Sequence, residues 1–284
     1  MSNTASKYFS LLATAIWLSL SIPAFAIEPA LDLKKIYSRT VDRKLKIPLN
    51  EQHYYADLLQ YYLHQAGLTN LPAQYILMTD RNPQVQAALL FLLTPDNKIK
   101  YIGASPVSTG MDSGYEHFET TLGIFEHTTQ NMDFRADGTE NQYGLRGYGN
   151  KGMRVFDFGW VKARKSWASE MGEMRLQLHS TDPNKLESKL GLAQSKGCIR
   201  IPATLNKFLD HYGVLDADYE RMASNKKITK LLSPEREPTP WGGKYLVVVD
   251  SRRAQRPDWS PQPTMKKSAA KIQKSSASID SRGS

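Results

Sequence analysis

The sequence contains a single cysteine, Cys198, among its 284 residues. A lone cysteine cannot form a disulfide within the chain, so packing alone must stabilise the fold. In an exported protein an odd cysteine indicates a reactive thiol or pairing between molecules. The alternative is a buried cysteine that acts as a small hydrophobic residue.

Long apolar runs are missing after residue 26, so no later segment is expected to span a membrane. The first 26 residues predict a cleaved secretory signal: Lys7 supplies positive charge, residues 9–20 are apolar, and Ala24-Phe25-Ala26 forms a small-x-small cleavage site. An uncleaved membrane anchor is the alternative, but the apolar run is short for that role. We therefore expect export to the periplasm or cell envelope, with cleavage near Ala26.

Acidic residues are scarce after Asp250. Residues 251–284 hold eight Lys and Arg residues against two Asp, a net charge of +6 out of the +9 of the whole chain. The segment is also rich in Ser and Pro, which predicts a basic, disordered tail. Nucleic acid is an unexpected partner outside the cytoplasm, so the tail is expected to contact acidic wall polymers or anionic surfaces.

Hydrophobic periodicity predicts a small helical region followed by a strand-rich domain. Apolar residues at helical spacing predict a helix over 51–66 and another over 204–212. Strands are expected over 86–93, 99–103, 120–127, 153–160, 175–179 and 244–250. The first two strands, joined by a polar turn, predict a β-hairpin.

These segments indicate four parts: a signal peptide (1–26), an N-terminal helical region (27–84), a catalytic domain (85–250) and the tail (251–284). The fold class is mainly β, as a sandwich or barrel-like domain. Residues 128–152 are polar and rich in Gly and Asn, which is typical of a long binding loop or lid.

The surroundings of Cys198 favour nucleophilic catalysis. A cysteine attacks as its thiolate, and a nearby histidine can act as the general base. His179 lies nineteen residues before Cys198 and ends a predicted strand. Gly197 leaves room for a tight turn beside the thiol, and the guanidinium of Arg200 suits a carboxylate. One Cys and one His alone leave the catalytic interpretation open.

The whole pattern resembles the L,D-transpeptidases of the YkuD family. That family has a histidine followed by a small residue and, after a gap, a Ser/Thr-His-Gly-Cys motif that leads to an Arg or Asn. Here the corresponding stretches are His179-Ser180 and Ser195-Lys196-Gly197-Cys198-Ile199-Arg200. Upstream, Ser108-Thr109-Gly110 and the segment 120–125 are also similar to the family, with Thr121 where proline is usual. The resemblance covers roughly residues 85–250.

The resemblance implies a peptidoglycan L,D-transpeptidase. Cys198 would attack the third residue of a tetrapeptide stem, D-Ala would leave, and an amine would resolve the acyl-enzyme to form a 3–3 cross-link or attach a protein or D-amino acid. His179 would be the base, oriented by the backbone carbonyl of Ser180. The amides of Gly197 and Cys198 would form the oxyanion hole, and Arg200 would contact substrate. Peptidoglycan stem peptides would be the partner, with no metal or cofactor.

Lys196 stands where the family usually has a second histidine. The lysine is expected to hold Cys198 as a thiolate or to bind a substrate carboxylate, and a tolerated surface lysine is the alternative. A zinc site made by His117, His127 and Cys198 is disfavoured because the spacings match no metal signature.

The acyl acceptor is not specified by these motifs. Water in place of an amine would make the protein an L,D-carboxypeptidase or amidase. A wall-binding protein with a degenerate site is the alternative without catalysis, and Lys196 is the feature that favours it.

Overall fold

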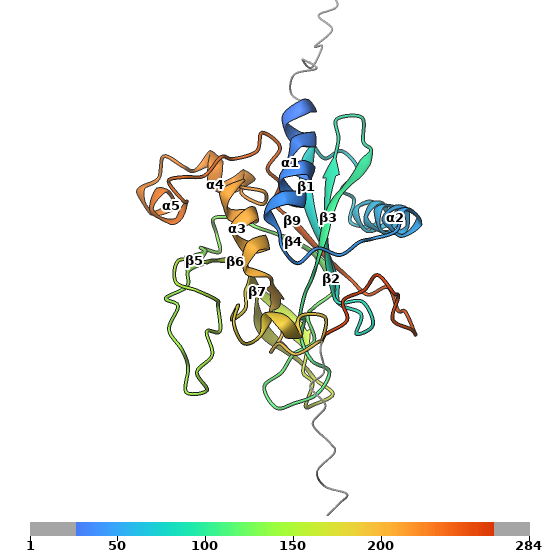
Figure 1. Ribbon diagram of the computed structural model, residues 1–284, viewed down its shortest axis with the longest axis vertical. Helices are drawn as coiled ribbons and strands as arrows, with labels where there is room; N and C mark the ends of the chain where they lie inside the picture. Colours follow the sequence, from blue (N-terminus) through green and yellow to red (C-terminus); the bar gives the residue numbers. More distant parts are fainter. Residues whose placement is uncertain (1–26, 264–284) are drawn as a thin grey trace, which may run out of the picture.

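The computed structural model describes residues 27–263, shown as a coloured ribbon in Figure 1. The helices are α1 (Ile27–Thr40), α2 (Leu49–Gln65), α3 (Ala203–His211), α4 (Ala217–Arg221) and α5 (Lys226–Leu231), with a short 3-10 turn, η2, at Glu187–Lys189. The strands are β1 (Gln74–Asp80), β2 (Ala87–Leu93), β3 (Ile99–Pro106), β4 (Gly123–Glu126), β5 (Phe134–Arg135), β6 (Arg154–Arg164), β7 (Met171–Ser180), β8 (Ile199–Ile201) and β9 (Tyr245–Val249).

The first sheet has the strand order β3-β2-β1-β9-β4. β2 pairs antiparallel with both β1 and β3, which confirms the predicted hairpin, and β9 returns parallel to β1. β1, β2 and β9 are buried along their whole length. Strands buried on both faces read as continuous apolar runs, which explains the uninterrupted sequence of β2.

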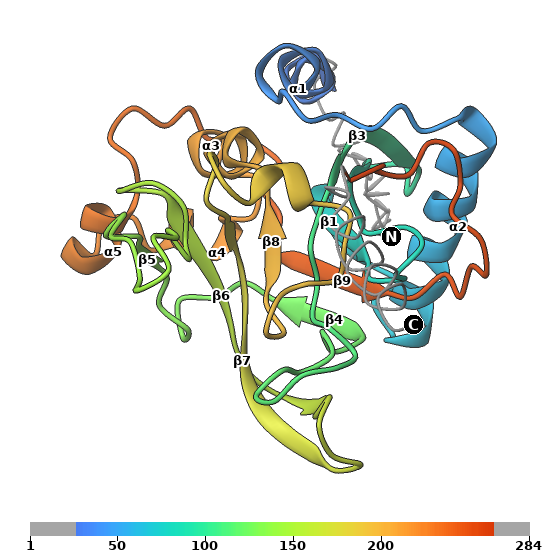
Figure 2. The same ribbon diagram turned by 60° about the horizontal axis from the view of Figure 1, so that its bottom comes forward.

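Two helices cover this sheet from opposite faces. Tyr55 and Leu59 of α2 pack in one apolar cluster with Ile76 and Met78 of β1. The alternate side chains of β1 point the other way, into the main core, which also receives residues of α1. Figures 1 and 2 place α1 and α2 on separate sides of the sheet.

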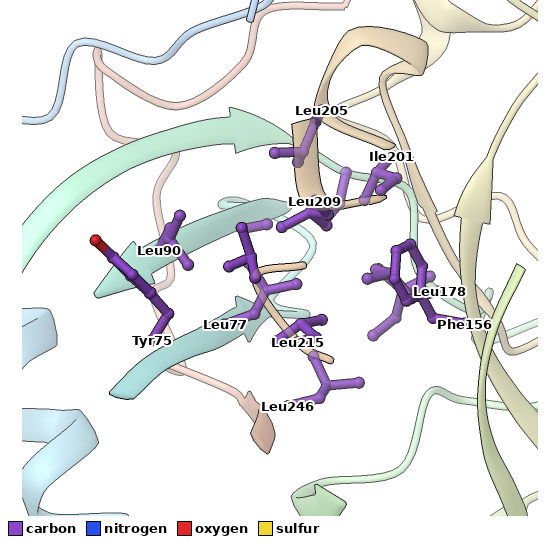
Figure 3. Close-up of a cluster of buried hydrophobic side chains, with 14 of the residues drawn as sticks. Tyr75, Leu77, Leu90, Phe156, Leu178, Ile201, Leu205, Leu209, Leu215 and Leu246 are labelled. Carbon is purple, nitrogen blue, oxygen red and sulfur yellow. The ribbon is translucent and has the colours of Figure 1, made fainter. Parts of the chain in front are cut away.

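The second sheet has the order β5-β6-β7-β8 and carries the residues of the predicted site. β6 and β7 form a long antiparallel hairpin whose tip extends away from the body in Figure 2. β8 is a short edge strand that pairs parallel with β7. The main core lies between the two sheets and α3, and Figure 3 shows side chains from all three converging there. The labelled residues are Tyr75, Leu77, Leu90, Phe156, Leu178, Ile201, Leu205, Leu209, Leu215 and Leu246.

The architecture is therefore mixed α/β with two sheets. The expected strand-rich core is present, but helices cover both of its sides, and within residues 27–263 neither sheet closes into a barrel. The predicted strands and the two predicted helices are found, with shifted ends. The short β5 and β8, and α4 and α5, were not predicted. No helix between residues 27 and 263 is both long and apolar enough to cross a membrane.

The boundary predicted at residue 84 is wrong. β1 lies in the supposed helical region, yet it occupies the centre of the first sheet between β2 and β9. Residues 27–84 thus supply a central strand and both covering helices of the sheet, and they do not form a separate unit. β1 was missed because both of its faces are buried, so it lacks the alternation of polar and apolar residues that marks a half-exposed strand.

The start of the tail is also corrected. Arg253 forms an ion pair with Glu51 of α2 at 2.5 Å, and the ring of Trp259 lies edge-on to Tyr55, with 5.9 Å between the centroids. Ser260 is buried and donates to the carbonyl of Gln84. Residues 251–263 therefore pack on the body. The remainder of the predicted tail, 264–284, and the predicted signal at 1–26 lie outside the described residues.

Candidate active site

Strand β7 separates core from site along its length. Leu176 and Leu178 point into the main core, whereas the alternate residues Arg175, Gln177 and His179 share the opposite side of the strand. This alternation follows directly from the sequence 174–179. β7 thus presents three polar side chains in a row, ending with the predicted base.

Cys198 lies immediately before β8, beside this row. The parallel register pairs Leu178 with Ile199 and His179 with Arg200, so the thiol is next to the middle of β7. Its sulfur lies 3.6 Å from the carbonyl oxygen of Arg175. Burial raises the pKa of the thiol, and the Gln177 backbone amide and the Arg200 guanidinium oppose that rise. The thiol is partly exposed and unbonded to any other sulfur.

His179 is held by one backbone hydrogen bond. Its Nδ1 donates to the carbonyl oxygen of Ser180 at 2.7 Å, which assigns the proton to Nδ1 and leaves Nε2 with a free lone pair. The imidazole is buried, and burial together with the charge of Arg200 lowers its pKa to about 4. His179 is therefore a neutral base at ordinary pH. Within residues 27–263 no hydrogen bond joins its Nε2 to the Cys198 thiol.

The nucleophile loop, residues 195–198, is fastened by the upstream motif that the sequence singled out. The amide of Ser195 donates to the carbonyl of Thr109, and Ser108 and Arg200 exchange two backbone hydrogen bonds. Thr120 links the two segments: its hydroxyl donates to the carbonyl of Gly197 at 2.7 Å and accepts from the amide of Gly110 at 2.8 Å. The residues around 108–110 and 120 are thus brought together with the predicted nucleophile.

Gly197 has a conformational role that only glycine meets easily. Its φ is +129°, and a Cβ there would lie 2.5 Å from the sulfur of Met174. Its amide donates to the hydroxyl of Ser195 at 3.0 Å. The Gly197 amide is therefore already hydrogen-bonded within the loop. Of the two amides predicted to form the oxyanion hole, only that of Cys198 has no hydrogen-bond acceptor among the described loop contacts.

The two cations near Cys198 differ in position. Arg200 donates to the carbonyl of Gln194 at 3.3 Å and acts electrostatically on the thiol, and no carboxylate between residues 27 and 263 pairs with it. Lys196 points to solvent, with 64% of its side chain exposed, and pairs with Glu116 at 3.4 Å. Of the two, Arg200 is the cation that faces the thiol.

Four further polar residues join this site, and sequence reasoning gave none of them a role. The buried carboxylate of Asp157, opposite Gln177 in the β6–β7 register, accepts from Gln177 Nε2 at 2.8 Å and from Arg175 at 2.7 Å. Tyr148, from the loop 128–152, donates its hydroxyl to Gln177 Oε1 at 3.2 Å. The alternation along β7 could have identified Arg175 and Gln177, but nothing local marks Tyr148.

A pocket of about 480 Å³ opens beside the nucleophile loop. It is lined among others by Gly110, Gln194, Arg81 and Glu119. Cys198, His179 and Arg200 are not among its lining residues, so the pocket neighbours the nucleophile loop without including the thiol.

The three residues of the disfavoured zinc site are not gathered. His127 lies in a separate buried cluster, bonded to Asp133, and no group of His, Cys, Asp and Glu suited to a metal ion is found among residues 27–263.

Comparison with known proteins identifies no relative: no family model matches the chain, and no curated protein matches it.

Proposed function

We propose that the protein is a cysteine acyltransferase that acts on peptidoglycan stem peptides, an L,D-transpeptidase of the cell envelope. The observation that carries the proposal is the β7–β8 register, which sets Cys198 beside a row of side chains that ends in a buried, neutral histidine. A thiol, a neutral base and a backbone carbonyl that orients the base are the groups that acyl transfer by cysteine requires.

In the proposed reaction the Cys198 thiol first turns from the Arg175 carbonyl toward His179. Apo structures often show such catalytic contacts longer than they are in the reacting complex. Nε2 takes the thiol proton, and the sulfur forms a bond to the carbonyl carbon of the third stem residue. The tetrahedral intermediate collapses, its C–N bond breaks, and the D-Ala amine leaves with the proton from His179.

The second half of the reaction reverses the proton transfers. An acceptor amine attacks the thioester, His179 receives the amine proton and returns it to the departing sulfur, and a new amide is released. The acceptor is a second stem, a protein or a D-amino acid, and water in its place gives hydrolysis.

The unpaired guanidinium of Arg200 supports a carboxylate-bearing substrate. An arginine fork binds a carboxylate with two parallel hydrogen bonds, and Arg200 has no protein carboxylate to do so within residues 27–263. We infer that Arg200 contacts a carboxylate of the stem. Lys196 is exposed and already paired with Glu116, so we assign it no contact with that carboxylate.

Localisation and the tail belong to the same proposal. The predicted signal at 1–26 would deliver the protein to the periplasm or cell envelope, where the substrate is found. The basic residues of 264–284 would add weak contacts to acidic wall polymers, which salt would screen.

A carbapenem and intact-protein mass spectrometry test the proposal. The wild-type protein is expected to gain one covalent β-lactam adduct, and Cys198→Ala none. A disaccharide-tetrapeptide, supplied with and without an acceptor amine, then separates transpeptidation from hydrolysis by the products formed. A wild-type protein that gains no adduct and leaves the disaccharide-tetrapeptide intact would be a wall-binding protein, and the proposed function would be wrong.

A further inference from the structure

The loop 128–152 approaches the end of β7 closely enough to cover His179. Gly149 makes this approach possible: its φ is +85°, and a Cβ there would lie 2.8 Å from the side chain of Ser180 and 2.7 Å from Met153. The neighbouring Arg146 donates its backbone amide to the buried carboxylate of Asp182 at 3.0 Å. The loop is thus fastened to the segment that follows the candidate base.

Tyr148 occupies the space between this loop and the imidazole. Its ring meets the ring of His179 edge to face, with 4.7 Å between centroids and 67° between planes. Phe134 packs on Tyr148 at 5.3 Å between ring centroids. The Tyr148 side chain therefore lies between Phe134 of β5 and the candidate base.

The hydroxyl of Tyr148 is tied to a chain of buried polar groups. It donates to Gln177, Gln177 donates to Asp157, and Asp157 also pairs with Arg175. A hydrogen-bonded network of this kind restrains the rotamer of each member. The ring of Tyr148 is consequently fixed over His179 from two directions, by packing and by its hydroxyl.

We propose that Tyr148 is a positioning residue: its ring excludes water from the imidazole of His179 and holds that imidazole in the orientation in which Nδ1 donates to Ser180. The role in catalysis rests on the proposed function, whereas the effect on His179 itself does not. Aromatic edge-to-face contacts of this geometry contribute packing energy beyond the buried area.

The Tyr148 ring over the imidazole determines how readily His179 takes a proton. Burial is the largest cause of the low pKa of His179, about 4, and Tyr148 supplies part of that burial. The charged group that acts on the imidazole is Arg200, its β8 neighbour in the register, whereas its β6 neighbour is the uncharged Val155. Without the ring, water reaches the imidazole and its pKa rises toward the ordinary value of 6.5.

Two variants separate the ring from its hydroxyl. In Tyr148→Ala the acidic limb of the pH profile of carbapenem acylation should move upward, with a fivefold to tenfold loss at about pH 5.5 relative to the loss at about pH 8. Tyr148→Phe keeps the ring, so its acidic limb should stay in place. Tyr143→Ala is the matched control, because Tyr143 belongs to the same loop and its side chain is 74% exposed. Its profile should match the wild type.

A readout without substrate keeps the inference distinct from the proposed function. The ring protons of His179, assigned by comparison with His179→Gln, are followed by NMR against pH in the wild type and in each Tyr148 variant. A raised pKa in Tyr148→Ala supports the inference even in a protein that forms no carbapenem adduct. An unchanged pKa in a folded Tyr148→Ala overturns it. Should Tyr148→Ala fail to fold, Tyr148→Gln gives the same comparison, because it admits polar atoms and water beside the imidazole.

Discussion

Two buried histidines in this protein have opposite acid–base character. His127 is fully buried between the Asp133 carboxylate, 2.9 Å from its Nε2, and the carbonyl of Leu215, 2.8 Å from its Nδ1. Burial alone would lower the pKa of His127, but the charges of Asp133 and Asp216 outweigh it and raise that pKa. His179 has only a backbone carbonyl as partner, so burial prevails and its pKa falls.

The difference shows that the neighbours decide what a buried histidine does. The cation of His127 belongs to a charge cluster with Asp133, Arg154 and Asp216, all of them buried. This cluster fastens the segments before β5 and before α4 to β6. His179, neutral and hydrogen-bonded on one nitrogen, keeps a lone pair for chemistry. One histidine therefore has a structural role, and the other is suited to catalysis.

Replacing each histidine by glutamine tests most directly whether the two histidines have different roles. His179→Gln should lower the rate of carbapenem acylation by about 10³-fold or more, because the thiol loses the base proposed for it, while the unfolding midpoint stays near that of the wild type. His127→Gln should instead lower stability and leave the rate per folded molecule within about threefold. Stopped-flow acylation and urea unfolding give the two quantities. Equal losses of rate in both variants would remove the distinction.

Removing the cation at the centre of the His127 cluster should have the next largest effect. Arg154 is fully buried and bonds Asp133 at 2.7 Å and Asp216 at 2.6 Å, so Arg154→Met leaves buried carboxylates without their partner. We expect a loss of about 3–5 kcal/mol in the free energy of unfolding, measured by urea denaturation.

Arg221→Met is the matched control for that variant. Arg221 also pairs with an aspartate, Asp218 at 2.6 Å, but its side chain is 71% exposed. Its loss should stay below about 1 kcal/mol. Similar losses for the buried and the exposed arginine would show that the cluster does not stabilise the fold as described.

The pH dependence of stability should carry opposite signs for the two histidines. The pKa of His179 in the folded protein lies below its value of 6.5 in the unfolded chain. The contribution of His179 to the free energy of unfolding is therefore complete above pH 6.5 and is lost as the pH falls toward 4, at a cost of about 3 kcal/mol. The folded pKa of His127 lies above 6.5, so its contribution is complete below that pH and is lost as the pH rises through the raised value.

Urea unfolding across this pH range checks both signs. His179→Gln should flatten the acidic side of the stability curve, and His127→Gln the alkaline side. A variant that flattens the opposite side would reverse the protonation states assigned to the two residues.

The smallest expected effect is on the reactivity of the Cys198 thiol when either of the two cations beside it, Lys196 or Arg200, is replaced. The rate at which iodoacetamide alkylates the thiol is measured against pH. In Lys196→Met this rate should stay within a factor of two of the wild-type rate at every pH, because Lys196 is exposed and paired with Glu116. Arg200→Met should raise the apparent pKa of the Cys198 thiol, since the charge of Arg200 acts on the thiol and lowers that pKa. A larger change in Lys196→Met than in Arg200→Met would restore the sequence-based role of Lys196 as the cation that holds the thiolate.

Local periodicity predicted much of the fold and part of the site. The hairpin of β2 and β3, the alternation along β7 up to His179 and the helix α3 follow from spacing that a single segment carries. The central position of β1 and the packing of 251–263 on α2 could not be predicted in this way, because each depends on contacts with residues far away in the chain. The same holds for Tyr148, which meets His179 across 31 positions of sequence.

By itself, the sequence determined which groups are available for chemistry: one thiol, a histidine at the end of an alternating strand, and a glycine where the loop must turn. The tertiary structure alone decided their states. It surrounded His127 with carboxylates and His179 with a carbonyl and an aromatic ring, and it turned Arg200 to the thiol and Lys196 to water. The physical reason is that a pKa depends on burial and on charges within a few ångströms, and distant segments of the chain supply both.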